Sequence, residues 1–222
     1  MSFISVFDVI GPNMIGPSSS HTAGAAAMAN LARKMITPPI VAVDFTLYGS
    51  FARTYRGHGT DRALLGGILG FSPDDERIRT SFAIAEERGL RYSFRTDRED
   101  TEVHPNTADM AMENAAGEKM LIRGESLGGG KIRISRINGA AVDFTGEYSA
   151  VIVIQRDTRG VAAHITRVLS DRGVNIAYMR VFREAKGSTA YTIVESDGTL
   201  PEEIRPELLE NPNILDAMIV EK

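Results

Sequence analysis

The 222-residue sequence predicts an α+β protein built from two domains, with the division near residue 146. Three observations support this fold class. Before the division, strand and helix patterns alternate irregularly and glycine is frequent. From Tyr148 onward the alternation becomes regular, and the stretch Phe144–Ala150 leaves room for only a short linker. We therefore expect one domain at residues 1–145 and a second at residues 148–222.

The elements of the first domain are predicted from apolar patterns and from residues that start or stop helices. A Ser/Thr-rich start before an alanine-rich stretch predicts a helix. Acidic residues at 74–76 favour a helix start, and Gly89 favours its end. Glycines at 128–130 separate two strands. The expected elements are a strand at 5–10, helices at His21–Met35, Thr60–Leu69 and Pro73–Arg88, and strands at Ile40–Tyr48, Leu90–Arg95, Asp109–Ala115, Glu118–Ser126 and Lys131–Ile137.

The second domain has a clearer pattern. An apolar strand at 148–157 is followed by an amphipathic helix at 158–173, whose apolar residues recur at helical spacing. Strands at 174–183 and 188–197 form a hairpin, followed by a helix at Pro201–Glu210 and a strand at Ile214–Val220. The resulting order, βαββαβ, is the ferredoxin-like arrangement.

Composition limits the possible classes of function. Hydrophobic content of 43% and charged content of 24% are ordinary for a globular protein, and a net charge of −4 favours neither a nucleic acid nor an anionic membrane as partner. No apolar run approaches the roughly 18 residues of a membrane span, and the N-terminus lacks a basic secretion signal, so we expect a cytoplasmic protein. The chain has no cysteine, which excludes disulfides and any thiolate-bound metal or cluster held by this chain alone.

Three short segments carry more polar residues and glycine than a core requires: PSSSHT (Pro17–Thr22), GHGTDR (Gly57–Arg62) and HPNT (His104–Thr107). Each contains one histidine and a hydroxyl. Before a helix, the first segment can bind a carboxylate through hydroxyls, unpaired N–H groups and the helix dipole. The residues with this potential are Ser18, Ser19, Ser20, His21 and Thr22. The alternative is a simple helix cap, for which one serine would suffice.

The other two segments leave two interpretations open. Glycines on both sides leave the His58 imidazole uncrowded, while Thr60 and Asp61 either cap the next helix or serve a ligand, and Asp61 could orient a histidine. His104 is restricted by the following proline, and Asn106 offers both a donor and an acceptor, although HPNT is also an ordinary turn sequence. The histidine spacing disfavours zinc, and no G-x-S-x-G elbow supports a nucleophilic serine.

The ordered set PSSSHTAG, GSFARTYRGHGTDRALLGGILG, HPNT and GESLGGGKIRI resembles the beta chains of two-subunit, iron–sulfur-dependent L-serine dehydratases over essentially the whole chain. Residues 1–145 would then resemble the allosteric substrate-binding domain of some phosphoglycerate dehydrogenases. The later sequence RDTRGVAAHITRVLSDRGVNI resembles an ACT domain, at residues 148–222.

This resemblance implies a reaction, a cofactor and a partner. The family eliminates water from L-serine to give pyruvate and ammonia without pyridoxal phosphate, and an open iron of a [4Fe-4S] cluster acts as the Lewis acid. Since cluster ligation takes thiolates, the cluster is expected on a separate alpha chain, with no metal ligand on this chain. His58 and His104 are expected to transfer protons. The residues expected to hold the substrate or orient these groups are Ser18, Ser19, Ser20, His21, Thr22, Thr60, Asp61 and Asn106.

The ACT-like module allows two roles. Asp157 and Gly160 lie on its first strand-to-helix turn and Asn175 opens its second strand, where ACT domains often bind an amino acid between subunits. The alternative is that the module only pairs subunits and Asp157 caps a helix; we expect an even-numbered oligomer. Two rival functions stay open: an amino-acid-sensing regulatory protein that is not an enzyme, and a metal-dependent hydrolase that uses the histidines.

Overall fold

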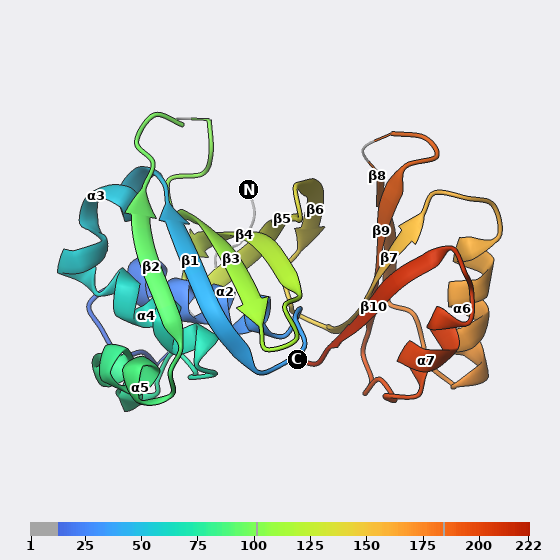
Figure 1. Cartoon of the computed structure of the whole chain (residues 1–222), viewed down its shortest axis with the longest axis horizontal. Coiled ribbons are helices and arrows are strands. Elements are labelled where there is room, and N and C mark those ends of the chain that lie inside the picture. Colours follow the sequence, from blue (N-terminus) through green and yellow to red (C-terminus); the bar gives the residue numbers. More distant parts are fainter. Residues whose placement is uncertain (1–12, 101, 184) are drawn as a thin grey trace, which may run out of the picture. The chain divides into compact units, whose positions relative to one another are not determined.

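The computed structural model describes the chain except for residues 1–12, 101 and 184, so the strand expected at 5–10 lies outside the described residues (Figure 1). The chain divides into two compact units, Met1–Asn138 and Gly139–Lys222. Each unit is mixed α+β, which confirms the predicted fold class. The stretch expected to be a linker, Phe144–Ala150, lies within the second unit.

The larger sheet has the strand order β2-β1-β3-β4-β5-β6. Strand β1 pairs in parallel with β2 and antiparallel with β3, and β4 pairs antiparallel with both β3 and β5. Buried residues alternate along β3, which is typical of a sheet covered on one face. The bounds are β1 (Ile40–Leu47), β2 (Arg91–Thr96), β3 (Thr107–Asn114), β4 (Lys119–Gly128), β5 (Lys131–Ile137) and β6 (Ala140–Phe144).

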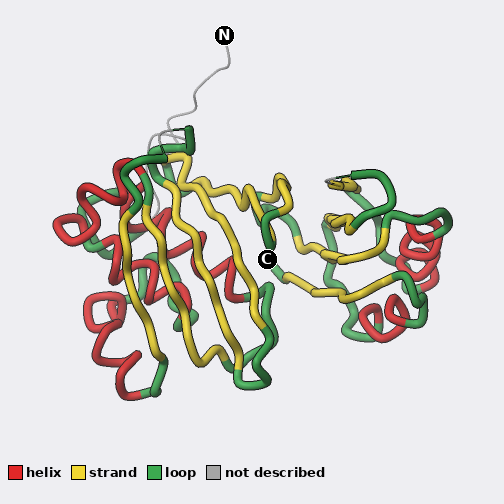
Figure 2. Tube along the Cα trace, turned by 45° about the horizontal axis from the view of Figure 1, so that its top comes forward, coloured by secondary structure: helices red, strands yellow, loops and turns green. Residues whose placement is uncertain are grey.

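The helices of the first unit cover one face of this sheet and leave the other face open (Figures 1 and 2). Phe45, Leu47 and Phe51 are fully buried in the core beneath the helices. Burial of this apolar surface is the main stabilising contribution of such a layer. The bounds are η1 (Ser19–Ala23, a π-helical turn), α2 (Gly24–Arg33), α3 (Gly49–His58), α4 (Thr60–Ile68), η2 (Glu76–Thr80, a 3₁₀ turn) and α5 (Ser81–Glu87).

Helix α3 was not predicted from the sequence, because its glycines and Thr54 gave the segment the composition of a loop. The burial of Phe51 and Ala52 against the sheet stabilises the helix despite this composition. Strand β6 was likewise not predicted. Of the two roles left open for Thr60 and Asp61, capping of α4 is not observed: the N-cap is Gly59, with a left-handed φ of 69°, and no side chain caps this helix.

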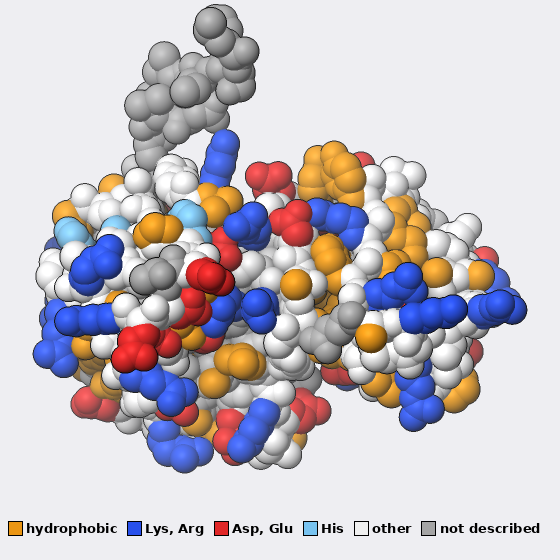
Figure 3. All heavy atoms as spheres, turned by 90° about the horizontal axis from the view of Figure 1, so that it is seen from above, with side chains coloured by type: hydrophobic (Ala, Val, Ile, Leu, Met, Phe, Trp, Pro, Cys, Tyr) orange, Lys and Arg blue, Asp and Glu red, His pale blue; other side chains and the backbone are white. Residues whose placement is uncertain are grey.

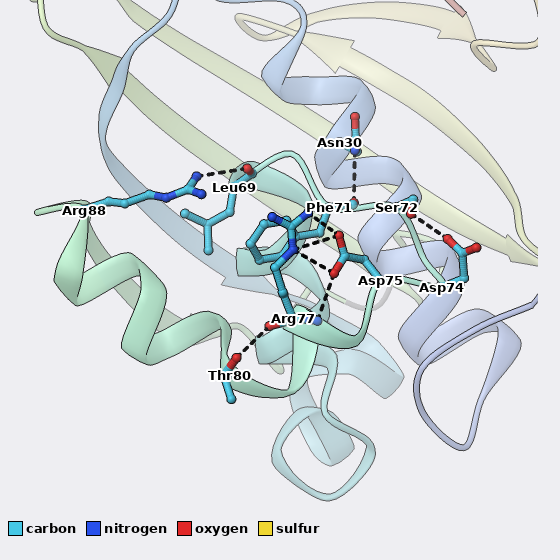
Figure 4. Close-up of polar contacts among 9 residues, drawn as sticks. All are labelled: Asn30, Leu69, Phe71, Ser72, Asp74, Asp75, Arg77, Thr80 and Arg88. Atoms are coloured by element: carbon cyan, nitrogen blue, oxygen red, sulfur yellow. Dashed lines mark hydrogen bonds and ion pairs between the residues drawn. The ribbon is translucent and has the colours of Figure 1, made fainter.

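The loop between α4 and η2 makes a set of polar contacts with α2 and with the turn that follows it (Figure 4). Phe71 is buried, and the Arg77 guanidinium lies 4.3 Å from the centre of its ring while pairing with Asp75. Asn30 of α2 donates a hydrogen bond to the Phe71 carbonyl at 3.0 Å. Ile15 donates to a carbonyl of the same loop, that of Pro73, at 2.9 Å. The loop thus fixes the approach to the Ser18–Thr22 turn.

From Ser149 onward the second unit has the predicted βαββαβ order, with strands arranged β10-β7-β9-β8 and two helices on one face of this sheet (Figure 1). Its core is formed by apolar residues of β7, β9, β10 and both helices, among them Val153, Ile165 and Leu208. His164 Nε2 lies 3.2 Å from the carbonyl oxygens of Glu207 and Leu208, so this histidine joins the two helices. The bounds are β7 (Ser149–Arg156), α6 (Val161–Asp171), β8 (Tyr178–Arg183), β9 (Thr189–Ser196), α7 (Ile204–Leu209) and β10 (Ile214–Val220).

Candidate functional site

The His21 imidazole lies at the centre of the first polar segment. Its Nδ1 atom lies 3.2 Å from the Ser20 hydroxyl and 3.4 Å from that of Ser18, and its Nε2 atom lies 3.0 Å from the hydroxyl of Ser50. Ser50 is the second residue of α3, so the imidazole joins two distant parts of the chain. Ser50 was not among the residues expected from the sequence. The available signal was a Gly-Ser pair directly after an apolar strand, where a helix can begin.

Capping explains why this segment folds as it does. Ser18 has extended backbone angles, and its hydroxyl accepts a hydrogen bond from the His21 backbone N–H at 3.1 Å. The helix expected from His21 therefore begins earlier, with the π-helical turn at Ser19–Ala23. The buried Thr22 donates its hydroxyl proton to the carbonyl oxygen of His58, at 3.3 Å. This bond joins the first polar segment to the second.

His58 is the last residue of α3, and Gly59 turns the chain from there into α4. The rings of His58 and His21 have centroids 4.9 Å apart and planes inclined by 55°. The Nδ1 atom of His58 and the hydroxyl of Thr60 are buried and have no hydrogen-bond partner among the described residues. Buried polar atoms are normally paired, so these two unpaired atoms, two residues apart in the chain, are unusual.

The third polar segment is seated on the start of α3. The Pro105 carbonyl accepts hydrogen bonds from the N–H groups of Ser50, at 2.6 Å, and Phe51, at 3.3 Å. A Cβ atom added at Gly49 would lie 2.7 Å from Pro105, and Gly49 has a φ of 51°, so only glycine fits here. All three segments therefore meet at α3. The first contacts it through His21, the second ends it, and the third caps it.

Hydrogen bonds within this third segment fix the state of its histidine. The Asn106 backbone N–H donates to Nδ1 of His104 at 3.2 Å, so a neutral His104 ring carries its proton on Nε2. The Asn106 amide donates to the Ser126 carbonyl at 3.4 Å, and Ser126 donates its N–H in return at 3.0 Å. The buried Ser126 hydroxyl has no partner among the described residues. Sequence reasoning also missed Ser126, which lies in the GESLGGG stretch.

Burial and charge act together on His21. Partial burial lowers its pKa below the ordinary value of 6.5, and the neighbouring His58 lowers it further, because a positive charge there disfavours a second one. His21 is therefore uncharged at neutral pH and acts as a hydrogen-bonding ring. In the space-filling view, histidine side chains reach the surface, with lysine or arginine side chains close by (Figure 3).

Asp61 is not brought into hydrogen bonding with these histidines. Its side chain lines a separate hollow of about 520 Å³, together with Tyr55, Phe82 and Glu86. Burial raises the pKa of this carboxyl, which the Arg62 N–H partly offsets. Ser19 is half-buried, and its carbonyl accepts the N–H of Gly24.

A second polar cluster lies on the open face of the larger sheet and was not predicted. Tyr48 donates to Asp109 at 2.8 Å, and the Arg123 guanidinium pairs with the same carboxylate at 2.6 and 2.8 Å. Burial, followed by the hydrogen bond and charge of Asp109, raises the pKa of Tyr48 to about 12. Tyr48 and Asp109 line a hollow of about 700 Å³.

In the second unit, Asp157 does not cap α6. It accepts hydrogen bonds from the Gly187 N–H and the Arg183 guanidinium, both at 3.0 Å, and these contacts lower its pKa. Gly160 is the helix N-cap, with a left-handed φ of 87°. Asn175 is exposed and precedes strand β8 rather than opening it. Asp157 thus fastens the β8–β9 hairpin to the turn before α6.

Metal sites and membrane spans were also considered. Within the described part of the chain, no group of three or more metal-binding side chains is positioned to hold an ion. The full sequence has no cysteine, so this chain's residues do not fit an iron–sulfur cluster, whose usual ligands are thiolates. Of the helices that the structure describes, none has the length and apolar character needed to cross a membrane.

Comparisons with known proteins give the family. Residues 5–113 match the serine dehydratase beta chain family, and residues 149–213 match the ACT domain family. The chain is 41% identical over its whole length to the full L-serine dehydratase beta chain of Peptoniphilus asaccharolyticus, and 42% identical over 98% of both chains to a probable L-serine dehydratase beta chain of Bacillus subtilis. A D-3-phosphoglycerate dehydrogenase of Bacillus subtilis is 26% identical over 89% of this chain and 37% of its own length. The chain is therefore a member of the serine dehydratase beta-chain family, with a C-terminal ACT domain.

Proposed function

We propose that this chain forms part of the active site of an L-serine dehydratase, which eliminates water from L-serine to give pyruvate and ammonia. The observation that carries the proposal is the convergence of three sequence-distant polar segments on α3, with buried, unpaired polar atoms on His58, Thr60 and Ser126. Relatives of nearly the same length are named L-serine dehydratase beta chains, which supports the reaction. Their name also supports a partner alpha chain.

The Ser18–Thr22 turn is proposed to bind the substrate carboxylate. It lies at the start of the η1–α2 helical segment, where the helix dipole favours a negative charge. The hydroxyls of Ser18 and Ser20 lie together there, 3.4 Å apart. Thr60 and Asn106 complete the proposed set of polar contacts, and Asp61 is left out of it because its side chain lines a separate hollow.

The two remaining histidines are proposed to have different roles in proton transfer. Elimination requires a base to take the Cα proton of serine while the β-hydroxyl leaves, which gives aminoacrylate and then, with water, pyruvate and ammonium. We propose His58 as the base that accepts that proton, because its ring lies beside the Ser18–Thr22 turn, with its centroid 4.9 Å from that of His21. The Asn106 N–H engages Nδ1 of His104, leaving an Nε2–H group suited to donate to the leaving oxygen or to the carboxylate.

We place the [4Fe-4S] cluster on the partner alpha chain, since this chain lacks cysteine. When bound there, the cluster supplies Lewis acidity to the serine hydroxyl, and the present chain supplies binding and proton transfer. No pyridoxal phosphate is required by this scheme.

Self-association through the ACT domain is also proposed. Strand β8 is the outer strand of its sheet, and Tyr178 and Val181 on it are 54% and 49% exposed. An apolar, exposed edge strand is suited to pair with another copy of the chain. Asp157, Gly160 and Asn175 are proposed to line an amino-acid site formed by such a pair.

Anaerobic co-expression with the alpha chain, followed by a pyruvate assay with L-serine, tests the main proposal. We expect pyruvate from the iron-loaded pair and none from either chain alone. His58→Ala and His104→Ala should each abolish most of the activity, whereas the matched control His164→Ala, in the second unit, should retain it. Serine binding to this chain alone without pyruvate from a well-loaded pair would instead support a regulatory, non-catalytic protein.

A further inference from the structure

We propose that Ser50 is a positioning residue of the site, which holds the His21 imidazole in the Nδ1–H tautomer and so leaves a hydroxyl proton of the Ser18–Ser20 pair available to a ligand. The effect of this arrangement on substrate binding rests on the proposed function. The contact between Ser50 and His21 is a property of this chain alone. The inference changes the role expected for His21, from a substrate ligand to a group that orders other side chains.

Both nitrogens of the His21 ring already have partners. Nε2 lies 3.0 Å from the Ser50 hydroxyl, and Nδ1 lies 3.2 Å from that of Ser20 and 3.4 Å from that of Ser18. The ring edge packs against Phe51, with centroids 5.2 Å apart and planes at 71°. His21 is thus held on three sides, and neither nitrogen remains to bind a ligand directly.

The donor and acceptor rules for imidazole link the two sides of the ring. A neutral imidazole has one N–H donor and one bare nitrogen that accepts. If Nδ1 carries the proton, it donates to Ser20, and Nε2 must accept the proton of Ser50. The hydrogen bond between the Ser18 and Ser20 hydroxyls uses one of their two protons, and the other proton is then available to donate to an anion. In the opposite tautomer Nδ1 would accept that remaining proton, so neither hydroxyl proton would be left for a carboxylate.

Ser50 is itself held rigidly. Its N–H donates to the Pro105 carbonyl at 2.6 Å, and its own carbonyl accepts the Thr54 hydroxyl proton at 2.8 Å. The backbone at Gly49 allows no Cβ on the side that faces Pro105. Ser50 is therefore fixed by the third polar segment and acts on the first through His21. The Ser50 hydroxyl therefore links the HPNT turn to the Ser18–Thr22 turn.

The tautomer can be measured directly in the isolated full-length chain. The sequence has only four histidines, so long-range ¹H–¹⁵N correlation spectra of ¹⁵N-histidine-labelled protein can be assigned with single variants. We expect His21 to show the Nδ1–H pattern in the wild type. In Ser50→Ala the pattern should change to averaged tautomers, and Ser50→Thr, which keeps the hydroxyl, should restore it. The control Ser93→Ala, on β2, should leave it unchanged.

Two results would overturn the inference. One is a wild-type His21 ring that averages both tautomers or carries its proton on Nε2, and this result needs no folded variant. The other is a folded Ser50→Ala protein whose His21 pattern is the same as in the wild type.

The assembled enzyme provides a second, separate measurement. Ser50→Ala should lower kcat/KM for L-serine on the order of 10- to 100-fold through misplacement of the serine turn, and Ser50→Thr should recover most of it. An equal loss in both variants would contradict positioning by the hydroxyl. If the wild-type pair makes no pyruvate at all, the proposed function fails, while the tautomer measurement still decides the role of Ser50.

Discussion

The imidazole rings of His21 and His58 lie 4.9 Å apart between centroids, although they come from different polar segments. One ring has hydroxyl partners on both nitrogens, and the other has a buried Nδ1 with no partner among the described residues. This asymmetry is consistent with the separate roles that we propose for His21 as an ordering residue and for His58 as a base. The charge of His58 also lowers the pKa of His21.

The first prediction concerns this coupling. His21 should titrate below the ordinary pKa of 6.5, because burial and the charge of His58 both disfavour its protonation. His58→Gln removes the charge but not the burial, so the pKa of His21 should rise in that variant and remain below 6.5. NMR titration of the labelled ring measures both values. An unchanged midpoint in His58→Gln would argue against electrostatic coupling of the two rings.

The same shift has a consequence for stability. The folded-state pKa of His21 lies below its unfolded value, so the unfolded state binds the proton more readily. The contribution of His21 to the free energy of unfolding is therefore fully present above pH 6.5. It is lost as the pH falls from 6.5 through the folded-state pKa. Urea unfolding at a series of pH values should show this loss. In His21→Asn the free energy of unfolding should change less steeply with pH than in the wild type. An equal pH dependence of the free energy of unfolding in the two proteins would contradict the lowered pKa of His21.

Gly49 provides a test of how the HPNT turn is seated. Gly49→Ala adds a Cβ 2.7 Å from Pro105 at a left-handed φ, so we expect a loss of about 1–3 kcal/mol in the free energy of unfolding. Gly57→Ala is the matched control on the same helix: its new Cβ would meet nothing within 4 Å, and alanine favours a helix by up to about 1 kcal/mol. If both variants unfold at the same urea concentration, close packing at Gly49 is not what constrains the turn.

Tyr48 should be an unusually weak acid. Its pKa of about 12 follows from burial and from its hydrogen bond to Asp109. An alkaline absorbance titration of the wild type minus Tyr48→Phe isolates this tyrosine, and we expect its midpoint near 12. Asp109→Asn removes the negative charge and should lower the midpoint toward 10. A midpoint near 10 in the wild type would mean that the cluster with Arg123 is not formed in solution.

His164 is predicted to stabilise the second unit without taking part in the reaction. Its Nε2 atom joins α6 to two carbonyl oxygens of α7, so His164→Ala should lower stability by about 1–2 kcal/mol. Thermal unfolding measures the loss. Pyruvate formation by the assembled pair at a temperature where the variant is folded should stay at the wild-type level, and a large loss there would assign His164 a role beyond packing.

Several features followed from the sequence alone. The βαββαβ order of the second unit was predicted because amphipathic periodicity and glycine stops are local signals. The elements observed from Ser149 to Val220 follow this order. The bounds of β5 and β10 also match the prediction. The three polar segments could be recognised because they contain more polar residues and glycine than a hydrophobic core requires.

Tertiary structure decided the rest, since it depends on contacts between residues far apart in the chain. Helix α3 forms because Phe51 is buried and Pro105 accepts its first N–H groups, and neither is visible in a glycine-containing local sequence. The same contacts place Ser50 against His21, and the turn at Gly59 leads Asp61 into a different hollow. The sequence by itself determined which segments are polar and how each unit is ordered. Long-range burial and hydrogen bonding decided which of those polar side chains meet, because a contact's partner is set by packing and not by local propensity.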